Sequence, residues 1–166
     1  VSGMMTRLGV GAVLFALASV AQAAVEKGTA KVLAVQGSAE VSIDGTEWKA
    51  LRRGEALHEG AWIRTSASAA ADLDLGRNGS QLGVMPNSTV AFAALTFEET
   101  GIETIINTQI DLRAGRVIGN VQKLSAASKY EVKSSKAVAT IRGTRYDFQA
   151  DGRLVVAEGS VVVVAF

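Results

Sequence analysis

Ala70-Ala71-Asp72-Leu73-Asp74-Leu75 alternates acidic and aliphatic side chains along six residues. Successive side chains of a strand point to opposite faces, so Asp72 and Asp74 share one face and the aliphatic residues the other. Such alternation is typical of a β-strand with one buried face and one solvated face. The stretch therefore predicts a strand at the surface of a β-sheet.

The same period of two recurs in both directions along the chain. The other runs are Lys31–Val35, Ala39–Ile43, Thr89–Phe92, Ile106–Leu112, Arg116–Gln122, Val138–Ile141 and Leu154–Ala157. Turn-forming pairs such as Asp44-Gly45 and Asp151-Gly152 separate the runs, and only Leu124–Lys129 suggests a turn of helix or a loop. The pattern predicts an all-β sandwich or roll of about ten to thirteen short, mostly antiparallel strands.

Three glycines repeat one local arrangement. Gly37, Gly115 and Gly159 each stand directly before a predicted strand and follow an earlier strand or turn. The repetition indicates a duplicated β unit or a coil of a β-roll. Ordinary hairpin turns would produce the same spacing, so both interpretations stay open.

The N-terminal segment is typical of a secretory signal peptide. Arg7 precedes an apolar run over Leu8–Ala21, shorter than the roughly 18–20 residues that span a bilayer as a helix. Ala21 and Ala23 supply the small residues that signal peptidase needs, which predicts cleavage before Ala24. We expect a signal-peptide helix over residues 1–23 and one domain over 24–166, exported to the periplasm or envelope of a bacterium. An uncleaved anchor or a buried helix is the alternative.

Composition excludes several kinds of chemistry. The 166 residues include no Cys and one His, which excludes disulfides, thiolate sites and clusters of histidine metal ligands. Lys and Arg number 17 against 16 Asp and Glu, so the chain lacks the basic excess of a nucleic-acid binder. We predict no metal, no cofactor and no nucleic-acid partner.

The residues offer few candidates for catalysis. His58 lies beside Glu59 as a conceivable general base, but no nucleophile is evident nearby. Asp72 and Asp74 would lie about 6–7 Å apart on one strand face, a spacing that some glycosidases use. A solvated strand face and a surface turn explain these residues more simply, so we predict that the protein is not an enzyme.

The most unusual run is Ala137-Val138-Ala139-Thr140-Ile141-Arg142-Gly143-Thr144-Arg145-Tyr146-Asp147-Phe148. Its alternation pauses at Arg142-Gly143-Thr144, which suggests a bulge or a close approach of two backbones. Arg142 would tie neighbouring carbonyls or a carboxylate, for which Asp111, Asp147 and Glu158 are the candidates. Alternatively, Arg142 and Arg145 contact an anion or a partner.

The order of motifs along the chain resembles the FecR domain, the periplasmic part of iron-dicitrate sensors and transmembrane anti-sigma regulators. The motifs that carry this resemblance are Gly37–Val41, Trp48, Leu51, Gly54, Leu57, Gly60, Ile63-Arg64-Thr65, Ala71–Leu75, Asn78-Gly79-Ser80, Met85–Ser88, Asp111–Val117, Tyr130–Val132, Ile141-Arg142-Gly143-Thr144, Tyr146, Phe148 and Glu158–Val161. Ala61 departs from the family pattern, in which an Asp commonly follows the preceding glycine. The matching residues Arg64, Thr65, Gly115, Gly159 and Ile141–Thr144 are expected to be structural.

The resemblance implies a non-catalytic domain that works by protein interaction or sensing in the envelope. A signal peptide replaces the cytoplasmic anti-sigma segment, so we expect an exported, stand-alone FecR-domain protein. Candidate partner contacts are Arg142, Arg145, Trp48 and Trp62, because aromatic residues and arginines are favoured at interfaces. The partner would be an envelope protein. The alternative is a carbohydrate- or cell-wall-binding module that uses exposed aromatic faces.

The apolar run Val161–Phe166 is predicted to form a buried last strand, or one that further chain covers. A membrane-barrel strand needs about 9–11 alternating residues and is therefore not expected. An apolar strand that nothing covers would form an adhesive edge.

Overall fold

The computed structural model describes residues 23–79 and 81–166. The predicted signal-peptide helix and Ala21 lie outside these described residues. Ala23 and Ala24 precede the first strand without regular structure. No helix in the described part of the chain is long and apolar enough to span a membrane.

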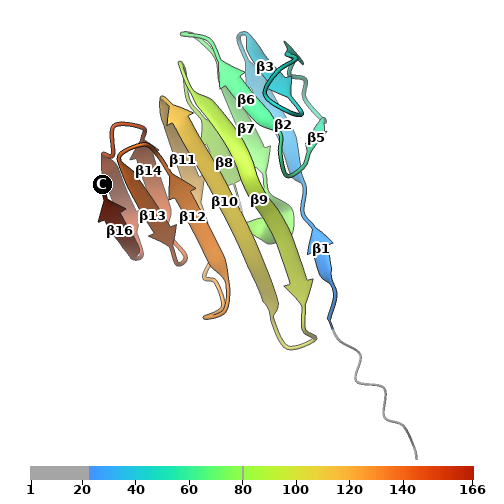
Figure 1. Cartoon of the computed structure of the whole chain (residues 1–166), viewed down its shortest axis with the longest axis vertical. Coiled ribbons are helices and arrows are strands. Elements are labelled where there is room, and N and C mark those ends of the chain that lie inside the picture. The colour runs from blue at the N-terminus through green and yellow to red at the C-terminus, as the bar shows by residue number, and fades with distance from the viewer. Residues whose placement is uncertain (1–22, 80) are drawn as a thin grey trace, which may run out of the picture.

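Two β-sheets pack face to face as a sandwich, which confirms the predicted all-β class (Figure 1). The nine-stranded sheet has the order β16 (Val161–Ala165), β13 (Ala137–Ile141), β12 (Lys129–Lys133), β10 (Thr104–Ala114), β9 (Thr89–Glu99), β6 (Trp62–Thr65), β3 (Ala39–Ser42) and β4 (Lys49–Ala50), and β1 (Val25–Lys27) also pairs with β9. The seven-stranded sheet has the order β15 (Leu154–Glu158), β14 (Arg145–Gln149), β11 (Arg116–Asn120), β8 (Gln81–Val84), β7 (Ala70–Asp74), β2 (Ala30–Gln36) and β5 (Ala56–Leu57). A short 3₁₀ turn, η1 (Gly76–Asn78), joins β7 to β8.

The described residues form sixteen strands, more than the sequence predicted. Among the strands without a predicted run, β1, β4 and β5 are two or three residues long and too short to show alternation. The pairing is antiparallel except between β10 and β12, which run parallel. Leu124 lies in the irregular link between β11 and β12, so its segment is a loop rather than a turn of helix.

Ten pairs of consecutive strands in the described residues lie in different sheets. Six of these pairs contain the repeated glycines or the links that face them. These pairs are β2–β3, β6–β7, β8–β9, β10–β11, β13–β14 and β15–β16. Two adjacent links, together with the paired strands that they join, form one bent corner of the sandwich. The six links therefore form three corners. Because β12 is parallel to β10 and antiparallel to β13, the corner at β13–β14 lies at the opposite end of the sandwich from the other two.

The three repeated glycines lie in these corners. Gly37 links β2 to β3, Gly115 links β10 to β11, and Gly159 links β15 to β16. Each has a positive φ, between +70° and +92°, and a side chain there would collide with the facing link. The repeated arrangement in the sequence therefore marks one structural position, the bend where a strand passes between sheets.

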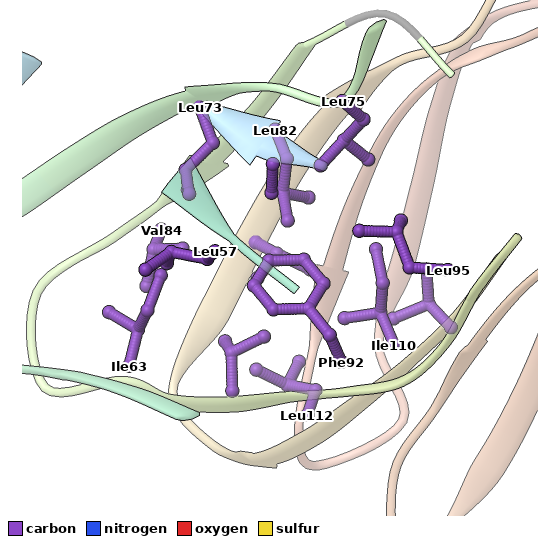
Figure 2. Close-up of a cluster of buried hydrophobic side chains, with 14 of the residues drawn as sticks. Leu57, Ile63, Leu73, Leu75, Leu82, Val84, Phe92, Leu95, Ile110 and Leu112 are labelled. Carbon is purple, nitrogen blue, oxygen red and sulfur yellow. The ribbon is translucent and has the colours of Figure 1, made fainter. Parts of the chain in front are cut away.

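The core lies between the two sheets. Phe92 stands at its centre, with Leu73 and Leu82 from the seven-stranded sheet on one side and Ile110 and Leu112 from the nine-stranded sheet near it (Figure 2). These side chains are at most 1% exposed. The alternation in Ala70–Leu75 is confirmed, because Ala71 and Leu73 are buried while Asp72 is exposed.

Of the two expectations for the last strand, burial among the described residues is wrong, and cover by further chain stays a prediction. β16 forms and pairs with β13 from Ile141↔Val161 to Ala137↔Ala165, but four of its five side chains are exposed. The physical reason is its position, since β15 and β16 are the last strands of their sheets. No described element closes the sandwich beyond them.

Candidate functional site

A polar row crosses the outer face of the seven-stranded sheet. The strand registers align Asp74 with Gln81, Gln81 with Asn120, and Asn120 with Arg145. Lys31 extends the row at one end and Glu158 at the other. The row results from strand alternation, because every second residue of these strands faces solvent.

The neighbouring row contains a gap. It runs through Asp72, Gly83, Ile118 and Asp147, and Gly83 brings no side chain to the outer face. A solvent-open hollow of about 500 Å³ lies over this part of the sheet. Residues that line it include Leu33, Asp72, Gly83, Met85, Ile118 and Arg145, and we call it the Gly83 hollow.

The Gly83 hollow combines an apolar floor with two opposite charges. Leu33, Met85 and Ile118 are half-buried, while Asp72 and Arg145 are exposed. Neither Asp72 nor Arg145 has an ion-pair partner within the described part of the chain. Such a hollow can hold a ligand segment by apolar contact and fix its direction through two charges.

Asp147 closes the row at the far side of Ile118 and is already paired. The Arg116 guanidinium donates to both carboxylate oxygens of Asp147, with Nε 2.7 Å from Oδ1. This hydrogen bonding raises the pKa of Arg116. Asp147 is therefore the partner of Arg116 and makes no described contact with Arg142.

The catalytic candidates do not come together. His58 is exposed at its turn, with Nδ1 3.4 Å from the carbonyl oxygen of Gly28, and does not line the hollow. Glu59 accepts the backbone N–H of Leu95 at 3.2 Å, and Asp74 accepts that of Gly76 at 2.9 Å. Across residues 23–79 and 81–166, no three His, Asp or Glu side chains gather closely enough to hold a metal ion.

Thr65 and Ser88 join the two corners at the upper end of the sandwich. Thr65 Oγ1 donates to the carbonyl of Met85 at 2.6 Å and accepts the N–H of Ser88 at 2.9 Å. Ser88 Oγ accepts the N–H of Arg116, directly after Gly115. These contacts tie the link after β8 to the end of β6 and the start of β11.

Arg142, Gly143, Thr144 and Gly159 meet in the third corner. Arg142 Nη1 donates to the carbonyls of Ala126 and Ser128, each at 3.1 Å, and so holds the loop before β12. Gly143 lies between β13 and β14, and a Cβ there would be 2.7 Å from the Cα of Lys123. The pause in the sequence is thus a close backbone approach at a sheet crossing and not a bulge inside one strand. Thr144 Oγ1 closes the corner by donating to the carbonyl of Ser160 at 2.9 Å.

The two tryptophans lie on the nine-stranded side, away from the Gly83 hollow. Arg64 sits over the Trp48 ring at 4.1 Å from its centroid, and Arg64 also pairs with Glu40, whose pKa is lowered mainly by this hydrogen bond. Arg113 lies 5.6 Å from the centroid of the Trp62 ring. Each indole therefore has a guanidinium over its ring, and both rings are half-buried.

Arg145 and Asp72 are the candidates from the sequence that the structure brings into one site. Gly83, Met85 and Ile118 shape the hollow and are not among the candidates predicted from the sequence. Gly83 could have been found as a glycine between the apolar residues Leu82 and Val84, because a glycine inside a strand often marks a close approach or an empty position. Asn120 could not have been found from the sequence, because only the strand register places it in the polar row.

Comparison with known proteins finds one family. The family described as FecR protein matches residues 61–162, more than half of the chain. This segment includes β6 to β15 and the three strands β8, β11 and β14 beneath the hollow. No curated protein and no solved structure matches the chain.

Proposed function

The chain belongs to the FecR protein family, and from that premise we propose that it is a sensing module that binds a protein segment in the Gly83 hollow. FecR is a non-enzymatic signalling family whose proteins are associated with the cell envelope. Family membership implies protein interactions in the envelope. The proposal adds export, with residues 1–23 as the signal peptide.

The observation that carries this proposal is the pair of charges across the hollow. Asp72 lies on β7 and Arg145 on β14, three strand spacings apart and offset by two residues along the strands, which together is roughly 16 Å at the usual spacing and rise of strands. An extended peptide covers this distance in about four or five residues. A partner segment with a basic and an acidic side chain at that separation would pair both charges while its apolar residues cover Met85 and Ile118.

The geometry also separates binding from structural roles among the arginines. Arg142 is occupied by backbone carbonyls, whereas Arg145 is free to contact a ligand at the rim of the hollow. The guanidinium groups over Trp48 and Trp62 occupy the flat faces that a sugar ring would need. These contacts favour a protein partner over the carbohydrate- or wall-binding alternative.

The experiment that tests this function is capture of partners from a bacterial envelope extract on immobilised residues 24–166. We expect retention of a specific protein, with binding about tenfold weaker for Arg145→Ala and for Asp72→Asn, equivalent to about 1.4 kcal/mol each. Arg53→Ala, which changes an exposed arginine elsewhere, is the matched control and keeps full binding. Circular dichroism establishes that each variant is folded.

Two results would redirect the proposal. Equal binding by Arg145→Ala, Asp72→Asn and the control would remove the hollow from the interaction. Retention of peptidoglycan or polysaccharide in place of a protein would assign the chain to the wall-binding alternative.

A further inference from the structure

The end of the sandwich at β15 and β16 exposes apolar side chains from both sheets. Val155 and Val156 are 54% and 39% exposed on β15, and Val162, Val163 and Val164 are 63%, 43% and 56% exposed on β16. Other large apolar residues are exposed singly elsewhere, as Val25 is on β1. Contiguous exposed apolar surface of this kind marks an interaction site more often than scattered residues do.

Two of these valines point toward the interior. Val163 pairs with Ala139, and Val156 pairs with Tyr146, and both of these partners are buried. Residues directly opposite on antiparallel strands share a face, so Val156 and Val163 face the space between the sheets. The core is therefore open at this end, and its last layer is in contact with solvent.

The backbone edges there are also unpaired. β15 and β16 each pair on one side only, with β14 and β13 respectively, and no described strand lies beyond them. β16 carries no charge, proline or bulge, the usual means by which exposed edges avoid pairing. A cover for this end must supply hydrogen bonds to two edges as well as apolar side chains.

We propose that a second copy of this chain covers this end, through a two-fold axis perpendicular to the sheets. Such an axis places β16 antiparallel to β16 of the partner and, in the other layer, β15 antiparallel to β15. The two layers lie about 10 Å apart, so the occupant must present two strand edges at that spacing. The same end of another copy has that spacing, and a two-fold interface uses the same surface on both subunits.

Charge favours this self-pairing. Pairing centred on Val163 brings only uncharged residues of β16 together, with Val162 opposite Val164. β15 has a bulge between Val156 and Glu158, so Leu154 and Val156 face inward while Glu158 faces outward beside Arg145. Pairing centred on Val155 places Leu154 opposite Val156 and keeps Glu158 out of the paired segment. The interface thus brings apolar residues together in both layers and sets no like charges face to face. The Gly83 hollow lies on the outer face of the sheet, so the proposal is independent of the proposed function.

The decisive experiment places a cysteine on the two-fold axis. The chain has no native cysteine, so Val163→Cys introduces one thiol per copy. Directly opposite residues have Cα atoms about 4.5–5.5 Å apart, within the range that a disulfide spans. We expect the full chain, purified as the cell processes it, to be dimeric, and Val163→Cys to cross-link to itself on mild oxidation. Val25→Cys, a control on β1 whose side chain is more exposed than that of Val163, stays uncross-linked.

A charge-swap pair tests the same contact without a covalent bond. Val163→Lys places two lysines opposite each other and should weaken dimerisation at least about tenfold, because like charges at opposed positions repel. Val163→Asp should do the same, and mixing the two variants should restore the dimer. Val25→Lys is the matched control that leaves association unchanged.

Analytical ultracentrifugation over a range of concentrations decides the outcome. A folded wild-type chain that stays monomeric at its solubility limit would overturn the proposal. A dimer that Val163→Lys leaves intact would place the interface elsewhere and also overturn it. If a monomeric chain instead captures a different envelope protein, and Val163→Lys abolishes that capture, the edge serves another partner and self-association is excluded.

Discussion

The two lateral ends of the sandwich solve the problem of an exposed edge in different ways. One end is formed by β4 and β5, which are two residues long, and an ion pair at 3.6 Å joins Lys49 of β4 to Glu55, which directly precedes β5. The other is formed by β15 and β16, which are five residues long and rich in valine. Short and charged edges resist pairing with other chains, whereas long apolar edges favour it. The comparison indicates that only the second end is built to be covered.

Both ends depend on a glycine with positive φ, but in different surroundings. Gly54 precedes β5 with φ +87°, and a Cβ there would meet nothing within 4 Å. Gly159 has φ +92° and packs against the carbonyl of Gly143 and the Cα of Thr144. The charged end has an open turn, while the apolar end is held by a tightly packed corner.

Substitution by alanine should therefore lower the free energy of unfolding much more at Gly159 than at Gly54. Gly159→Ala combines backbone strain with a collision against backbone atoms, and we expect a loss of about 3 kcal/mol or more in the free energy of unfolding. Gly54→Ala introduces only the strain of a positive φ and should lower the free energy of unfolding by about 1 kcal/mol. Urea denaturation followed by circular dichroism measures both.

Equal losses at the two positions would mean that the conformation alone matters and that the corner has room to adjust. A larger loss for Gly54→Ala would reverse the comparison. Either result would also weaken the view that the third corner fixes β15 and β16 in place.

The part of the core next to β15 and β16 is shielded from solvent, although the valines of these two strands are exposed. Tyr130 and Tyr146 are buried there with their hydroxyl oxygens 3.2 Å apart, and burial raises the pKa of both phenols above the usual 10.0. Because the folded state keeps both phenols neutral, their effect on stability is intact below about pH 10. It is lost as the pH rises from 10 toward the raised values, by up to about 1.4 kcal/mol per pH unit for each tyrosine.

Replacing both tyrosines tests this sealing. The double variant Tyr130→Phe with Tyr146→Phe removes both hydrogen-bonding groups, so its stability at pH 7 should stay close to that of the wild type. Above pH 10 it should lose less stability than the wild type in urea denaturation. Parallel losses in the two proteins would show that water already reaches the phenols through the open end.

The parts of the fold that depend on local alternation could be predicted from the sequence. Ala70–Leu75 forms the expected strand with the expected buried face, and the three glycines that repeat before strands were recognised as a pattern. Their common role at sheet crossings could not be derived, because it depends on which strands pair across the molecule. The same limit applies at Gly143, where the alternation of apolar and polar residues stops. Lys123 lies close to Gly143 in the fold but is distant from it in the sequence.

The candidate site was predicted only in fragments. Alternation marks Asp72, and the interrupted run Ala137–Phe148 marks Arg145, but nothing local joins β7 to β14. Their common position depends on the registers of β7, β8, β11 and β14. Val161–Phe166 shows the opposite error, since an apolar run predicts burial but cannot tell whether any element lies beyond it.

The smallest expected effect concerns the end formed by β4 and β5. It tests whether the shortness of β4 or the charge of Lys49 keeps this end from pairing with another chain. Lys49→Val removes an exposed ion pair in which the lysine side chain is 70% exposed, so stability should change by no more than about 0.5 kcal/mol. β4 pairs only Lys49 and Ala50 with β3, and such a short edge offers few groups to another chain. We therefore expect no new oligomer in analytical ultracentrifugation, although the variant edge is now apolar. A concentration-dependent species larger than that of the wild type would show that the charge of Lys49, rather than the shortness of β4, keeps this end free, and the contrast between the two ends would then rest on charge alone.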